Sequence, residues 1–205
     1  MPIYNAPLAD MKFILNDVFN AEQFWQANEN LAHVDAATAE AILEEMAKFA
    51  QNVTHPLNRT GDEEGATYSN GNVTTPAGFK EAFKQYAEGG WIGLAADEEW
   101  GGQGMPKMLT VLADEMLFAT NPSFMLYPLL SVGAGMALNS YASQEQKETY
   151  LPKMYTGEWS GTMCLTEPHA GTDLGIIKTK AERNDAGTYN ITGTKVFRSE
   201  EHTSE

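Results

Sequence analysis

Residues 161–175, GTMCLTEPHAGTDLG, are the part of this sequence best suited to ligand binding. A short apolar run, residues 162–165, predicts a strand that ends in Thr-Glu-Pro-His-Ala-Gly-Thr-Asp. Glycines and short hydroxyl side chains leave backbone N–H groups accessible there, so the segment suits a large planar or phosphorylated ligand. The alternative is an ordinary turn, capped by Thr and Asp, in which Cys164 is buried as a small apolar residue.

Other residue types that could do chemistry have less favourable spacing. The glycine-rich stretch LAADEEWGGQGMP, residues 94–106, lacks the Lys-Ser/Thr of a phosphate loop and predicts a flexible turn beside a pocket. The acidic clusters 62–64 and 97–99 lack the spacing of a metal-binding loop and indicate solvated surface. Three histidines show no metal-ligand spacing and are interpreted as surface or loop residues: His33, His55 and His169.

The bulk composition limits the classes of partner. With 205 residues, 42% of them hydrophobic, the chain can bury a core and suits one or two domains. Its 13 basic and 28 acidic residues give a net charge of −15, which repels phosphate backbones and anionic lipids, so we expect no nucleic-acid or membrane partner. A single cysteine excludes an intrachain disulfide, and the N-terminus lacks a signal peptide, so a cytoplasmic location is expected.

Apolar residues recur at helical spacing in the first part of the chain. Residues 8–18 predict one amphipathic helix, and residues 42–53 predict a second that ends before Pro56. Residues 57–75 are rich in Gly, Asn, Asp and Thr and predict a loop, in which Asn70-Gly71 favours a small hairpin.

Further helices follow this loop. Thr75-Pro76 predicts an N-cap with proline at the first helical position, and Gly89-Gly90 ends the helix that they begin. Residues 108–117 form the next periodic stretch. Residues 122–141 are nearly apolar on all sides and are expected to be enclosed by protein on every side. Ser143 with Gln146 forms a capping-box pattern that opens a helix ending near Gly157.

At Trp159 the periodicity changes from helical to alternating. Residues 176–183 and 188–197 alternate on either side of the turn sequence NDAG, with Gly193 as a bend. We therefore expect an α+β fold in which an all-helical N-terminal domain, residues 1–158, precedes the start of an antiparallel β-barrel or sandwich domain, residues 159–197.

The sequence CLTEPHAGTD resembles the signature of the FAD-dependent acyl-CoA dehydrogenase family. It matches at Cys164, Leu165, Thr166, Glu167, Ala170, Gly171, Thr172 and Asp173. GGWIGL at residues 89–94, GGQGMP at 101–106 and ITGTKVF at 191–197 also stand where that family has them. Ile176 departs from the usual small residue, and the continuation LGIIKTKA resembles a subgroup of longer members that includes the 3-methylmercaptopropionyl-CoA dehydrogenases.

This resemblance implies roles for individual residues. Met163, Leu165 and Thr166 would lie along the isoalloxazine ring of FAD, and Phe197 would pack on the flavin. Thr172 would contact the CoA portion of an acyl-CoA substrate. Glu167 and Pro168 match loop-shaping residues, because in the family the catalytic base is a glutamate of a later helical domain. No catalytic residue and no metal ligand is therefore assigned within this chain.

The resemblance also implies an activity, which is α,β-dehydrogenation of an acyl-CoA by a homo-oligomeric flavoenzyme that passes electrons to an electron-transfer flavoprotein. The alternatives are an acyl-CoA oxidase and a non-catalytic scaffold that keeps the fold. Residues 122–141 would border the acyl tunnel or form plain core. Residues 198–205, RSEEHTSE, look like the translation of a sequencing adapter, so we expect an N-terminal fragment that is inactive alone.

Overall fold

The computed structural model describes residues 3–196, which form two compact units. The first, called the helical unit, extends to Gly161, and the second, called the β unit, begins at Thr162. Helices followed by a small antiparallel sheet confirm the predicted α+β class. The predicted domain ranges, 1–158 and 159–197, stay a prediction.

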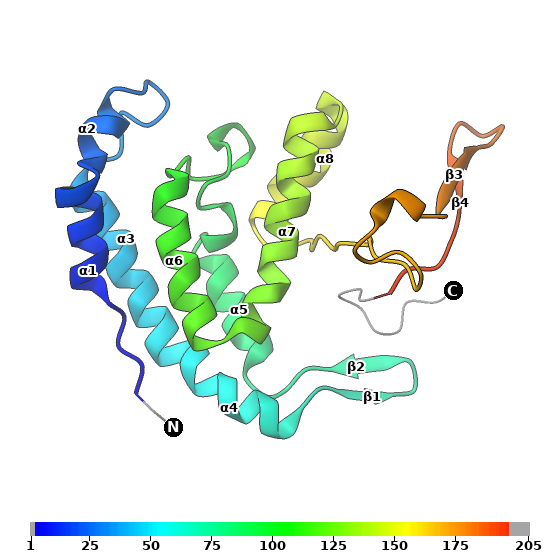
Figure 1. The fold of residues 1–205 in the computed structure, drawn as a ribbon, viewed down its shortest axis with the longest axis horizontal. Helices are drawn as coiled ribbons and strands as arrows, with labels where there is room; N and C mark the ends of the chain where they lie inside the picture. Colours follow the sequence, from blue (N-terminus) through cyan, green and yellow to red (C-terminus); the bar gives the residue numbers. More distant parts are fainter. Residues whose placement is uncertain (1–2, 197–205) are drawn as a thin grey trace. The chain divides into compact units, whose positions relative to one another are not determined.

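The helical unit is a row of helices with one projecting hairpin (Figure 1). Its α-helices are α1 (Leu8–Phe13), α2 (Ala21–Gln26), α3 (Ala36–Phe49), α4 (His55–Glu64), α5 (Phe79–Glu88), α6 (Lys107–Thr120), α7 (Pro122–Tyr141) and α8 (Gln144–Tyr155). Neighbours in the row are α1 and α3, α3 and α6, α6 and α7, and α7 and α8. No helix within residues 3–196 is both long enough and apolar enough to cross a membrane.

The core of the helical unit lies where the apolar stripes of these helices meet. Its largest fully buried side chains are Trp25, Met11, Leu15, Leu43, Met46, Leu109, Met116, Leu117, Met125, Leu151 and Val34. Each contributes about 1.5–3 kcal/mol through removal of apolar surface from water. The predicted helical periodicities for residues 42–53 and 108–117 are confirmed by this burial. The stripe predicted for residues 8–18 is confirmed only in part, because Met11 and Leu15 are buried whereas Ile14 and Val18 are exposed and lie in a π-helical segment, Ile14–Val18, that follows α1.

The chain passes Pro56 without leaving the helical path, so the predicted end of the second helix is wrong. A π-helical segment, Ala50–Thr54, joins α3 to α4, and Pro56 lies in the first turn of α4. Proline is tolerated where its missing N–H is not needed, and the π segment interrupts the regular hydrogen bonding just before it. Asn121 donates from Nδ2 to the Thr54 carbonyl at 3.2 Å and so satisfies a backbone acceptor at this irregularity.

The hairpin predicted at Asn70-Gly71 is confirmed. Strands β1 (Thr67–Ser69) and β2 (Asn72–Thr74) pair antiparallel around these two residues, both of which have positive φ. The predicted start of the next helix is wrong, because α5 begins at Phe79 after Gly78 rather than at Thr75-Pro76. The Ala77 N–H instead donates to the Glu64 carboxylate at 3.0 Å, which holds this stretch outside the helix.

Helix α7 is only partly enclosed by the described residues, which contradicts the expectation for residues 122–141. Phe124 and Met125 are buried, whereas Leu126 and Met136 remain 56% and 60% exposed. Because no sharp polar face marks the helix, the sequence did not distinguish the covered side from the open one. The capping box of Ser143 and Gln146 at α8 is confirmed.

The β unit is a two-stranded sheet preceded by irregular chain. Strands β3 (Lys180–Arg183) and β4 (Tyr189–Thr192) pair antiparallel with Lys180 opposite Thr192 and Arg183 opposite Tyr189. In the alternating stretch predicted from residue 176, Ile176 belongs to a 3-10 turn, Leu174–Ile176, and residues 177–179 are irregular, so the strand begins only at Lys180. Residues 162–165 form no strand, so that prediction is wrong.

Candidate functional site

The candidate site is the segment 163–172 of the β unit. It contains a tight turn in which Glu167 and Ala170 exchange two backbone hydrogen bonds, each 3.0 Å long. Proline at position 168 suits such a turn because its φ is fixed in advance. The turn places the Glu167 side chain inside the β unit and leaves His169 exposed.

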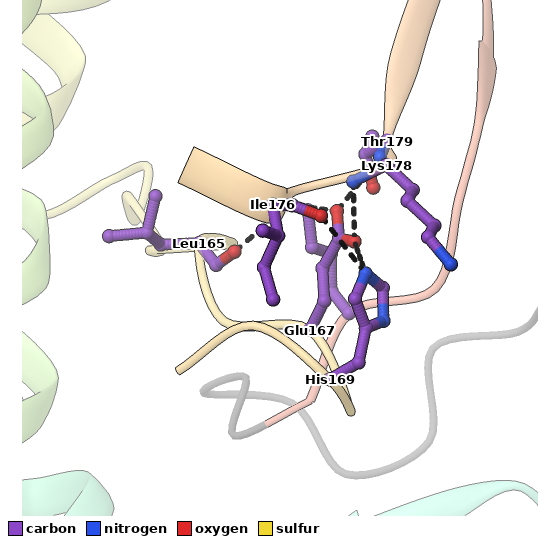
Figure 2. A network of polar contacts seen from close by, with 7 residues as sticks. Leu165, Glu167, His169, Ile176, Lys178 and Thr179 are labelled. Atoms are coloured by element: carbon purple, nitrogen blue, oxygen red, sulfur yellow. Dashed lines mark hydrogen bonds and ion pairs between the residues drawn. The ribbon is translucent and has the colours of Figure 1, made fainter. Parts of the chain in front are cut away.

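The Glu167 carboxylate is surrounded by hydrogen-bond donors. It accepts from the backbone N–H of Lys178 at 2.8 Å and of Thr179 at 2.9 Å, and from Lys195 Nζ at 2.9 Å. Its side chain keeps 1% of its exposure, and His169 Nε2 lies 3.4 Å from Oε2. Figure 2 shows the carboxylate facing the backbone of Lys178 and Thr179 on one side and the His169 ring on another.

These donors lower the pKa of Glu167 well below its ordinary value of 4.5. The Thr179 side chain is the largest cause and the backbone N–H of Lys178 follows, while Lys195 and the backbone N–H of Thr179 contribute further; burial acts in the opposite direction. The carboxylate is therefore a stable anion at neutral pH and a poor proton acceptor. This agrees with its assignment as a loop-shaping residue and not as a catalytic base.

Two residues after strand β4, Lys195 and Val196, form hydrogen bonds to the residues just before the Glu167 turn. Lys195 Nζ donates to the Leu165 carbonyl at 2.9 Å, and the Val196 N–H donates to the Thr166 carbonyl at 2.9 Å. Two successive carbonyls are thus fixed by two successive residues from about thirty positions later in the chain. Lys195 was not identified from the sequence, because its separation from Glu167 gave no local signal.

The residues assigned to flavin by resemblance lie along this anchored segment. Met163 and Leu165 are 55% and 41% exposed although both are apolar, and Thr166 is half-buried. Thr172 is exposed beyond the turn. Cys164 is also exposed, so the alternative that buried it as a small apolar residue is wrong. Phe197 lies outside the described residues.

Backbone donors are available on the same segment. The N–H groups of residues 163–166 donate to no group among residues 3–196. Unpaired N–H groups beside exposed apolar side chains suit a flat ligand with an apolar face and a polar edge. The structure therefore brings together Leu165, Thr166 and their supports around Glu167 in one anchored segment.

Two cavities of the helical unit bear on the sequence predictions. One of about 320 Å³ is lined by Ala96, Asp97 and Met105 of the glycine-rich segment and by Val132 and Met136 of α7. This segment is a turn beside a pocket, as predicted. A second cavity of about 370 Å³ lies between α5 and α7, and its lining includes the aromatic residues Phe79, Phe83, Phe124 and Tyr127.

Comparison with known proteins gives consistent matches. Residues 36–158 match the family described as Acyl-CoA dehydrogenase, N-terminal domain. A 3-methylmercaptopropionyl-CoA dehydrogenase of Ruegeria pomeroyi is 41% identical over 194 residues, which are 95% of this chain and 33% of that protein. A butyryl-CoA dehydrogenase of Syntrophomonas wolfei is 32% identical over 198 residues, which are 95% of this chain and 32% of that protein.

A solved structure matches the fold. An acyl-CoA dehydrogenase of Bacillus anthracis complexed with FAD superposes with a TM-score of 0.68 and 26% identity, covering 82% of this chain and 27% of that one. The chain spans about a third of the length of the curated relatives that it matches.

Proposed function

The chain belongs to the acyl-CoA dehydrogenase family, and from that premise we propose that the whole protein dehydrogenates an acyl-CoA at its α and β carbons with FAD as cofactor. The observation that carries this proposal is the anchored segment 163–172, which offers apolar side chains together with N–H groups, those of residues 163–166, that donate to no group among residues 3–196. The subgroup of 3-methylmercaptopropionyl-CoA dehydrogenases gives the first substrate to test, because one such enzyme is 41% identical to this chain.

The residues present fit a flavin. Met163 and Leu165 would contact the apolar part of the ring, while the Thr166 hydroxyl and nearby N–H groups would meet its polar edge. Such donors stabilise negative charge that develops during reduction, and Phe197 is proposed to pack against the ring. When bound, FAD accepts the hydride that leaves the β-carbon of the substrate.

For substrate binding, we propose one group of residues in each unit, and each is described by itself. Thr172, exposed and followed by the acceptor Asp173, is proposed to contact the CoA portion. The aromatic cavity between α5 and α7 supports binding of an apolar acyl group.

Glu167 is not suited to be the proposed base. Glu167 is the acidic residue within the segment 163–172, but its oxygens accept from three donors and its pKa is lowered. A general base must be able to take a proton near the working pH. We therefore propose that a carboxylate outside these 205 residues removes the α-proton, and that this chain alone is inactive.

The experiment uses the whole protein, purified and reconstituted with FAD. Anaerobic addition of 3-methylmercaptopropionyl-CoA or butyryl-CoA should bleach the flavin absorbance, and an electron-transfer flavoprotein should restore it faster than oxygen does. Faster recovery with oxygen would favour an acyl-CoA oxidase. If the whole protein does not bind FAD, the only remaining alternative is a non-catalytic scaffold with this fold. A homo-oligomer and a cytoplasmic location remain predictions.

A further inference from the structure

We propose that Glu167 is a positioning residue of the cofactor site, whose buried carboxylate fixes the peptide between Leu165 and Thr166 and thereby aims the Thr166 N–H at the flavin. This inference rests on the proposed function. It assigns Glu167 a role through neighbouring backbone, with no contact to the cofactor itself.

The first step is that Glu167 joins the turn to the chain entering the sheet. Both carboxylate oxygens are used, since Oε2 accepts from Lys178 N at 2.8 Å and Oε1 accepts from Thr179 N at 2.9 Å. Two backbone N–H groups on one carboxylate define its plane as well as its position. The turn is therefore fixed against the residues just before β3.

The second step is that Lys195 transmits this position to the segment before the turn. Its ammonium donates to Glu167 Oε1 and to the Leu165 carbonyl, each at 2.9 Å. The Lys195 side chain is 17% exposed, so little water competes for it. The Glu167 carboxylate thus fixes the position of the Lys195 ammonium, and this ammonium fixes the position of the Leu165 carbonyl.

The third step follows from the planarity of the peptide bond. In a trans peptide the C=O of one residue and the N–H of the next point in opposite directions. Because the Leu165 carbonyl points to Lys195, the Thr166 N–H points away from it, and this N–H donates to no group among residues 3–196. The Val196 N–H fixes the following carbonyl, that of Thr166, so the plane cannot turn freely.

An ordinary buried ion pair that only stabilises the β unit is the competing explanation. It predicts loss of folding stability with no change in the cofactor that the folded protein binds. The positioning role predicts a changed cofactor site in protein that remains folded. Glu167→Gln separates them, because it removes the charge and places an NH₂ group against a backbone N–H that needs an acceptor.

The matched control is Glu182→Gln in the same unit. Glu182 pairs with Lys180 at 3.0 Å, but these side chains are 62% and 59% exposed, so the pair is solvated. In the whole protein, we measure the Kd for FAD, the absorption spectrum of bound flavin, and the thermal midpoint of the apoprotein. Glu167→Gln should weaken FAD binding about tenfold or more and shift the flavin spectrum, as loss of orienting groups does elsewhere. Glu182→Gln should leave all three unchanged.

The possible outcomes separate this inference from the proposed function. Wild-type protein that binds no FAD would contradict the proposed function. If the wild type binds FAD and Glu167→Gln binds it with the same Kd and the same flavin spectrum, only the positioning role of Glu167 is overturned. If Glu167→Gln does not fold, Lys195→Gln is tested in its place. This variant keeps both backbone hydrogen bonds to Glu167 and removes the ammonium link to the Leu165 carbonyl, so the same weakening of FAD binding is expected. Collapse of both variants, with Glu182→Gln folded, would show a role in folding and overturn the proposal as well.

Discussion

Lys195 and Glu167 are 28 residues apart in the sequence, yet Lys195 Nζ lies 2.9 Å from Glu167 Oε1, where the two side chains keep 17% and 1% of their exposure. This pair joins the two ends of the described β unit at a point where no regular strand pairing holds them. Removing one member of a buried pair leaves the other charge uncompensated, which costs more than the pair itself contributes. The pair is therefore the structural basis of segment 163–172.

The charge of Glu167 predicts an acid-dependent loss of stability. Its pKa is lowered in the folded protein, so its contribution is fully present above its ordinary pKa of 4.5 and is lost as pH falls from there through the folded pKa. Among residues 3–196, Lys195 and His169 are the charged or titratable side chains that face it. In urea unfolding of the whole protein, the difference in midpoint between wild type and Glu167→Gln should be constant from neutral pH to 4.5 and shrink towards about pH 3. A difference that does not change with pH would contradict this assignment.

We expect replacement of Asn121 by alanine to reduce folding stability more than the loss of an ordinary helix cap does. Its Oδ1 accepts from the Phe124 N–H at 3.0 Å to cap α7, and its Nδ2 donates to the Thr54 carbonyl, with the side chain fully buried. Asn121→Ala should lower the free energy of unfolding by about 2–3 kcal/mol, because it removes a helix cap and also a buried hydrogen bond to the Thr54 carbonyl. The exposed cap Ser143 of α8 is the control, for which Ser143→Ala should cost about 1 kcal/mol. Equal losses in chemical unfolding would show that the Thr54 contact contributes nothing.

The two adjacent glycines of the turn beside the pocket should differ in their tolerance of alanine. Gly101 has a φ of +86°, and an added methyl group there would meet no other atom within 4 Å, so Gly101→Ala should cost about 1–2 kcal/mol from the backbone conformation alone. A Cβ at Gly102 would overlap the Ala96 carbonyl oxygen, which also accepts from Gly104 N. Gly102→Ala should therefore cost about 3 kcal/mol or more. Unfolding curves of both variants test the order, and a milder effect at Gly102 would contradict it.

Local patterns predicted much of this fold. Asn70-Gly71, the Ser143–Gln146 capping box and the turn between the last two strands depend on neighbouring residues only, and each is confirmed. Patterns failed where distant contacts decide the structure. Pro56 is accommodated by a π segment supported by Asn121, and the six-residue helix α2 is too short for a periodic signal and depends on burial of Trp25.

The candidate site divides in the same way. The motif at residues 163–172 could be found from the sequence because its residue types lie next to one another. Its supports could not, because Lys178, Thr179 and Lys195 reach Glu167 across 11 to 28 positions, and two of them act through backbone N–H groups that carry no side-chain signature.

Amide hydrogen exchange of the whole protein, with and without FAD, is the sharpest test of whether segment 163–172 holds the cofactor. We expect FAD to slow exchange in the peptide 163–172, because N–H groups without partners among residues 3–196 gain a ligand. The core helix α3 serves as an internal reference that should not change. FAD binding that protects other regions and leaves exchange in residues 163–172 unaltered would contradict the assignment of this segment to the cofactor site.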